Sequence, residues 1–148
     1  MKTFVTIVLI SLSTFFSFSQ NPLKLSIVKG AELPNSEPIN YYLLEISNST
    51  QREAQIIISA VNQICTNTRM EVVRLNQEVL DKQKNRKLNL ITIAAGESVE
   101  FYLKLSRPLN TRTNTWNCTE IKAITENGSQ LSNAITIESL IPNSNNAE

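Results

Sequence analysis

Hydrophobic and polar residues alternate along most of the chain after residue 22. This period of two is typical of β-strands that bury one face. It is clearest at residues 98–106, where every second side chain is apolar and the intervening ones are polar. Such segments lie at residues 23–27, 41–47, 54–61, 91–93, 98–106, 119–123 and 135–137.

Turn-forming residues separate these segments. Two prolines interrupt AELPNSEP (31–38), and a polar NSTQ follows residue 47. Short alternating strands with frequent turn signals indicate antiparallel pairing rather than βαβ units. We therefore predict an all-β fold, an antiparallel immunoglobulin-like β-sandwich of about seven strands.

The segment at residues 70–80 is ambiguous. Val72, Leu75 and Val79 have helical spacing, whereas Val73 and Leu75 fit an edge strand. Because strands surround it, the pattern favours an edge strand followed by a loop.

The first 19 residues have the features of a cleaved signal peptide. A positive Met1-Lys2 precedes a short apolar run, and small residues at Ser17 and Ser19 suit a signal peptidase. The apolar run is too short for a stable membrane span. We expect a signal peptide at 1–19, one domain at 20–142 and a polar tail at 143–148. The chain is thus expected to be exported to the periplasm, the cell surface or the medium.

Composition excludes several kinds of function. The chain has no histidine and only three glycines, which removes His-dependent catalysis, His-ligated zinc and glycine-rich phosphate loops. Without Lys2, the chain has thirteen basic and thirteen acidic residues, so its net charge is close to zero. Neither nucleic acid nor anionic membrane is therefore an expected partner. The basic run DKQKNRK (81–87) is expected to be a solvated loop. We predict a protein that is not an enzyme and holds no cofactor or metal.

Three stretches carry a family resemblance. YYLLEISNST, ITIAAGESVEFYLKLSRP and TWNCTEIKA together resemble bacterial exported domains of the immunoglobulin-like and fibronectin type III-like, cell-adhesion-related group. The resemblance implies a structural or protein-interaction module of the cell envelope, and it supplies no catalytic residues.

Two cysteines are candidates for a disulfide. Cys65 and Cys118 are the only cysteines, and an exported domain is exposed to an oxidising compartment. An internal bridge is the favoured interpretation. Two buried thiols, or pairing with another chain, are the alternatives.

Three aromatic residues are candidates for ligand or partner contacts. Trp116 is expected to pack near the core of the sandwich. Alternatively, Trp116 with Tyr41 or Tyr102 forms an exposed platform, which would make the protein a carbohydrate-binding module. A protein or a glycan is therefore the expected partner, and the oligomeric state is left open.

Overall fold

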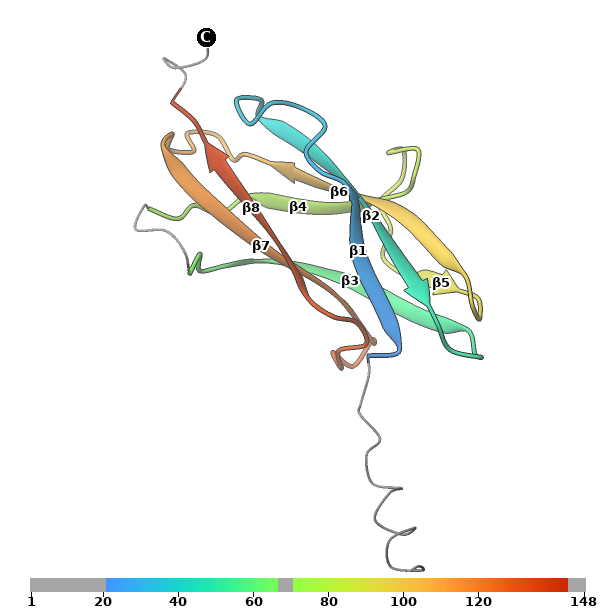
Figure 1. Cartoon of the computed structure of the whole chain (residues 1–148). Coiled ribbons are helices and arrows are strands. Elements are labelled where there is room, and N and C mark those ends of the chain that lie inside the picture. The colour runs from blue at the N-terminus through green and yellow to red at the C-terminus, as the bar shows by residue number, and fades with distance from the viewer. Residues whose placement is uncertain (1–20, 67–70, 144–148) are drawn as a thin grey trace, which may run out of the picture.

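Two four-stranded antiparallel sheets pack face to face (Figure 1). This computed structural model describes residues 21–66 and 71–143. The strands are β1 (Leu23–Lys29), β2 (Ile39–Asn48), β3 (Ala54–Gln63), β4 (Asn76–Leu80), β5 (Ile91–Ile93), β6 (Ser98–Ser106), β7 (Thr115–Ile124) and β8 (Ile135–Ile141). One sheet has the order β1-β2-β6-β4 and the other β5-β3-β7-β8. The predicted all-β sandwich is confirmed, with eight strands rather than about seven.

The core lies between the sheets and follows the alternation of the sequence. In β2 and β6, Leu44 and Phe101 are paired in register, and both are fully buried. Ile56 of β3 and Ile121 of β7 face them from the other sheet and are also fully buried. Burying side chains of this size contributes roughly 1.5–3 kcal/mol each, which makes this layer the main source of stability.

The ambiguous segment forms an edge strand, as the pattern favoured. The strand β4 pairs with β6, but it begins at Asn76 and leaves out Val73 and Leu75, on which the prediction relied. The reason is a change of sheet. Val73 still bonds to β7, its N–H donating to the carbonyl of Trp116 at 2.8 Å, and the chain then crosses to β6.

Three asparagine side chains each bind both backbone groups of one leucine. A side-chain amide has the same donor and acceptor as a peptide group, so it can take the place of a neighbouring strand. We call these pairs the asparagine clamps. They are Asn40 on Leu33 (3.1 and 2.7 Å), Asn62 on Leu75 (3.0 and 2.9 Å) and Asn133 on Leu25 (2.8 and 2.9 Å). The last two join the two sheets, one clamp on each side of the sandwich.

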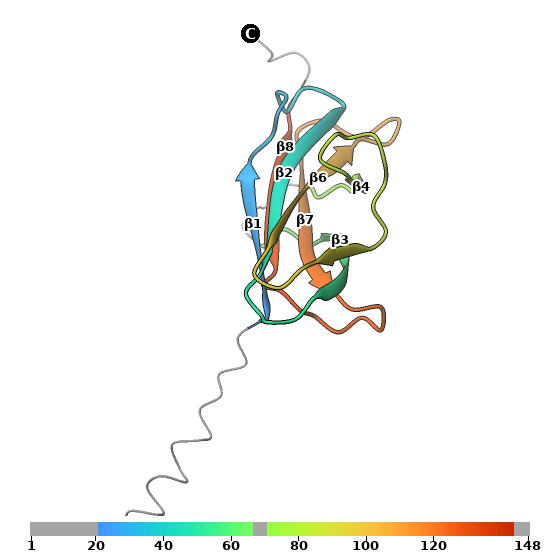
Figure 2. The same cartoon turned by 90° about the vertical axis from the view of Figure 1, so that its right-hand side faces the viewer.

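The described chain starts and finishes at opposite ends of the sandwich, as the two views show (Figure 2). The predicted signal peptide at 1–19 and nearly all of the predicted tail lie outside the described residues. Within the part of the chain that the structure describes, no helix is long and apolar enough to cross a membrane.

Candidate functional site

Cys65 and Cys118 form a disulfide, which confirms the favoured interpretation. The two Cα atoms lie 5.4 Å apart, and no free cysteine is present. Cys65 comes two residues after Gln63, and Gln63 is the register partner of Cys118 in the β3–β7 ladder. The bridge therefore fastens the end of β3 to its neighbour within one sheet and does not join the two sheets. A disulfide indicates an extracytoplasmic domain.

The three aromatic candidates are divided between the two sheets. Tyr41 of β2 and Tyr102 of β6 are half-buried neighbours, with ring centroids 6.3 Å apart and planes at 90°. Trp116 lies on β7 in the other sheet. It is half-buried and outside the buried core, and its backbone N–H donates to the backbone carbonyl of Glu71 at 3.0 Å. The structure thus brings the tyrosines together and leaves Trp116 elsewhere.

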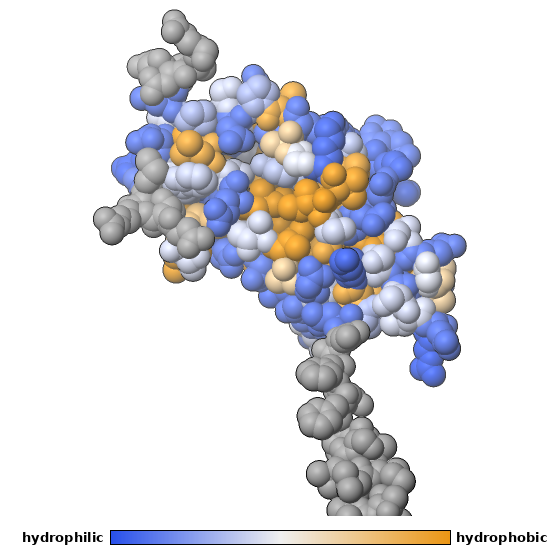
Figure 3. Space-filling model, in the orientation of Figure 1, coloured by the Kyte–Doolittle hydropathy of each residue, from blue (hydrophilic) through white to orange (hydrophobic). Residues whose placement is uncertain are grey.

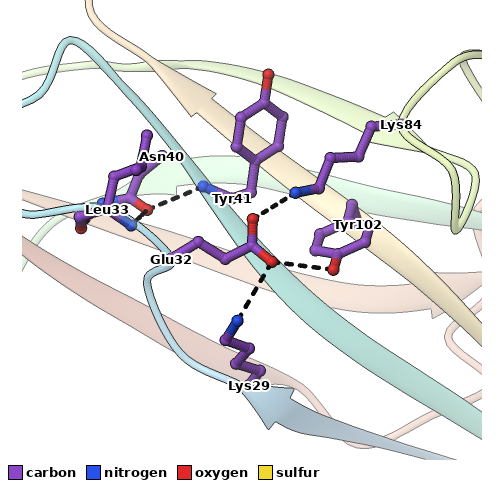
Figure 4. A network of polar contacts seen from close by, with 7 residues as sticks. All are labelled: Lys29, Glu32, Leu33, Asn40, Tyr41, Lys84 and Tyr102. Atoms are coloured by element: carbon purple, nitrogen blue, oxygen red, sulfur yellow. Dashed lines mark hydrogen bonds and ion pairs between the residues drawn. The ribbon is translucent and has the colours of Figure 1, made fainter.

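The two tyrosines belong to a polar cluster on the outer face of their sheet (Figure 4). We call it the Glu32 cluster: Lys29, Glu32, Tyr41, Lys84 and Tyr102. The ammonium of Lys84 lies 4.5 Å from the centre of the Tyr41 ring and 4.3 Å from that of Tyr102. It also donates to Glu32, which accepts a 3.0 Å hydrogen bond from the Tyr102 hydroxyl.

Charge pairing shifts the pKa values within this cluster. The hydrogen bond from Lys84 lowers the pKa of Glu32, opposed by the effect of burial. The same bond raises the pKa of Lys84, again against the effect of burial. The hydrogen bond to Glu32 is the largest cause of the raised pKa of Tyr102. All three groups are therefore held in their usual charge states near neutral pH.

The Glu32 cluster joins two loops across β2 and β6. Glu32 lies in the β1–β2 loop and Lys84 in the β4–β5 loop, where it adopts a positive φ of 60°. Since the Lys84 ammonium covers both rings, and the rings are perpendicular, the tyrosines offer no flat platform for a sugar. The cluster acts as a fastening between loops.

An apolar area is visible over the space between β1 and β8 (Figure 3). On β1, Ile27 and Val28 are 43% and 49% exposed. The two sheets are nevertheless tied together here, by the Asn133 clamp and by a 3.0 Å hydrogen bond between Tyr42 and Ser139. The hollow beside these two residues measures ≈ 20 Å³, enough for about one water molecule. This hollow is too small for a larger ligand.

On the opposite side of the sandwich, β3 has an unpaired edge. The N–H of Ala123 in β7 donates to Ser132 and its carbonyl accepts from Leu131, so its backbone groups point away from β3. The backbone N–H and C=O groups of successive strand residues point to alternate sides. Those of Lys122 and Ile124 therefore point toward β3.

Lys122 and Ile124 are the register partners of Ser59 and Ile57, whose backbone groups therefore bond to β7. The backbone groups of the alternate residues, such as Ile58, point to the other side of β3. β5 occupies that side only as far as Ile56. We define the open edge of β3 as the backbone of Ile58, Ala60 and Asn62, which no strand of the described chain pairs on this side.

Two hollows lie along the open edge of β3. The larger one, the main cleft, measures ≈ 340 Å³ and is lined by Ile57, Ile58, Ala60, Gln77, Val79, Lys87, Leu88 and Asn89. The smaller one, the side cleft, measures ≈ 260 Å³ and is lined by Asn62, Gln63, Ile64, Val72, Val73 and Arg74. Val61 and Ile64 beside them are 46% and 82% exposed. Partly apolar walls and an unpaired edge together form a surface that suits a polypeptide.

Sequence reasoning found this site only in part. Ile57 and Val61 indicate an apolar strand edge that could pair with a protein partner, but the pattern contains no information on where β5 stops pairing. Across the described ranges 21–66 and 71–143, no group of three or more Cys, Asp or Glu side chains is placed to hold a metal ion.

The fold defines a class, the antiparallel β-sandwich, and the similarity to one solved structure supports that assignment. The crystal structure of a FixG-related protein from Vibrio parahaemolyticus is similar over 82% of this chain and 96% of that one, with 14% identity and a TM-score of 0.53. The apo PmoF2 PCuAC domain covers 80% and 93% of the two chains, with 11% identity and a TM-score of 0.41, too low to carry an argument. No family model and no curated protein matches the sequence. The likeness concerns the fold alone.

Proposed function

We propose that this chain is an exported, non-catalytic module of the cell envelope that binds another protein through the open edge of β3. The observation that carries the proposal is the unpaired backbone of Ile58, Ala60 and Asn62 beside two partly apolar clefts. A strand edge left open in this way is a surface on which a partner chain can pair.

Other features agree with this function. The disulfide between Cys65 and Cys118 fits the periplasm, the cell surface or the medium. The resemblance to immunoglobulin-like and cell-adhesion-related domains points to the same kind of role. The carbohydrate-binding alternative is less well supported, since Tyr41 and Tyr102 lie on one sheet and Trp116 on the other.

Site-specific photo-cross-linking tests the proposal. A photoreactive phenylalanine analogue replaces Val61, beside the open edge, and in a matched variant it replaces Lys24 on β1. In cells that express the protein, we expect a discrete cross-linked product from Val61 and none from Lys24. The product should disappear when Ala60→Leu narrows the main cleft. Equal cross-linking from both positions, or none from Val61, would contradict a partner at this edge.

A further inference from the structure

We infer that the open edge of β3 accepts an extended peptide segment of the partner, with an apolar side chain in the main cleft and carboxylates next to Lys87 and Arg74. This inference rests on the proposed function and specifies the chemistry of the partner. It combines the backbone, the clefts and the charge around them.

No strand of the described chain occupies the place that such a segment would take. Residues ahead of β5 would continue along β3 opposite Ile58 and Ala60 if the strand were longer. Instead, Leu88 stays with the other sheet, where its N–H donates to the carbonyl of Val79 at 2.9 Å. The chain crosses to β3 only at Ile91. The outward backbone groups of Ile58, Ala60 and Asn62, which span about 13 Å at ~3.3 Å per residue, are left without a strand.

The main cleft provides room for a side chain of this segment. Its volume of ≈ 340 Å³ is bounded by Ile58, Val79 and Leu88, and the Asn62 clamp on Leu75 closes the passage between the sheets beyond it. The cleft wall also includes Gln77, whose amide nitrogen is the one buried side-chain nitrogen or oxygen of the described residues without a hydrogen-bond partner. An occupant with a carbonyl oxygen would satisfy that donor.

The charged residues of the two clefts are both cationic. Lys87 lines the main cleft and Arg74 the side cleft. Neither lies within ion-pair distance of a described carboxylate, whereas Lys82 and Lys84 of the same basic run are paired with Glu100 and Glu32. The pKa of Glu78 is lowered mainly by the hydrogen bond from Lys104, its ion-pair partner, and to a smaller extent by the charge of Lys87. Complementary charge selects and orients partners, so the occupant is expected to be acidic next to its apolar residues.

A second copy of this chain fits the site less well. The strand β3 has the sequence AQIIISAVNQ, which contains no carboxylate. Two copies that paired edge to edge through β3 would bring their Lys87 side chains together with no acidic residue of β3 between them. The charge therefore favours a different protein.

Binding of two synthetic peptides tests the inference. Both are blocked octapeptides with valine and threonine in alternation; one has glutamate at each end and the other lysine. We expect the glutamate peptide to bind the oxidised protein at least tenfold more tightly, measured by fluorescence anisotropy at low salt. It should also slow amide hydrogen exchange at Ile58, Ala60 and Asn62, whose backbone N–H groups no strand of the described chain pairs on the open edge.

Two variants and a matched control locate the binding. Lys87→Glu should reverse the preference between the peptides, and Lys24→Glu, on the distant strand β1, should leave it unchanged. Ala60→Leu should weaken the glutamate peptide at least tenfold by filling the main cleft, and its thermal unfolding temperature shows that it is folded. Should Ala60→Leu fail to fold, Lys87→Glu still decides the matter.

Several results would overturn the inference. These are equal affinity for both peptides, protection of other amides, or concentration-dependent dimerisation with no peptide bound. Cross-linking from Val61 together with absence of peptide binding would refute the inferred acidic peptide segment but not the proposed function. Absence of both would refute the two proposals together.

Discussion

Replacing Asn62 by aspartate tests whether an asparagine clamp stabilises the sandwich. The side chain makes three hydrogen bonds: two with the backbone of Leu75 and one, at 2.6 Å, in which its oxygen accepts from Asn117. Aspartate has nearly the same shape and can still accept from Leu75 N–H and from Asn117. Only the donor that reaches the carbonyl of Leu75 is lost.

The magnitude follows from that single lost donor. In Asn62→Asp, a carboxylate oxygen stands about where Nδ2 lies, 2.9 Å from the carbonyl oxygen of Leu75. Loss of a partner for a buried polar group costs about 1–3 kcal/mol. Asn62 is half-buried, so we expect a loss of about 2 kcal/mol in the free energy of unfolding. For a domain of this size, that lowers the unfolding temperature by roughly 8 °C.

Urea unfolding of the oxidised protein at pH 7 measures the effect. Asn76→Asp is the matched control, because Asn76 is exposed at the start of β4 and close to Leu75 in sequence. The control should change stability by less than about 0.5 kcal/mol, as is usual for surface positions. If Asn62→Asp is no worse than Asn76→Asp, the clamp does not stabilise the fold and the reasoning is wrong.

Three further predictions concern the disulfide, the Glu32 cluster and one turn. Replacing Cys65 and Cys118 by alanine should lower the free energy of unfolding by about 4 kcal/mol, the chain-entropy value for a separation of 53 residues, as measured by urea titration; no change would contradict it. The pKa of Glu32 is lowered from its ordinary value of 4.5, so its stabilising effect is present above pH 4.5 and is lost as the pH falls through the lowered value. In Glu32→Gln, the free energy of unfolding should change less with pH in that window. Gly96→Ala should destabilise the protein by about 1 kcal/mol, because φ is +72° there, whereas Gly30→Ala, which also has open space for a Cβ but is not in that conformation, should not; thermal unfolding compares the two.

The alternation in the sequence was sufficient to predict the layers but not the edges. Period two placed Leu44, Phe101 and Ile121 in the core, since burial of one strand face is a local property of the pattern. Strand ends depend instead on which neighbour accepts the backbone. Asn62 and Leu75 lie 13 positions apart, and nothing in their local sequence indicates a clamp. The extent of the open edge of β3 could not be predicted for the same reason.

The same limit applies to the aromatic candidates. Tyr41 and Tyr102 are diagonal neighbours because Tyr41 pairs with Lys104, two residues beyond Tyr102. That register comes from long-range pairing of β2 with β6. The Lys84 ammonium that covers both rings comes from a basic run that the sequence indicated only as a solvated loop. The disulfide could be predicted because only one internal pairing was available.

The position of the disulfide has a consequence for recognition. A strand that pairs with a partner must be held extended, and any strand that frays loses conformational entropy on binding. Cys65 follows directly after the open edge of β3 and fixes it to Cys118 of β7. The edge is therefore preorganised, so association does not require it to be ordered first. In the reduced chain this end of β3 is free to fray, and affinity for a strand should fall even while the core of the sandwich remains folded.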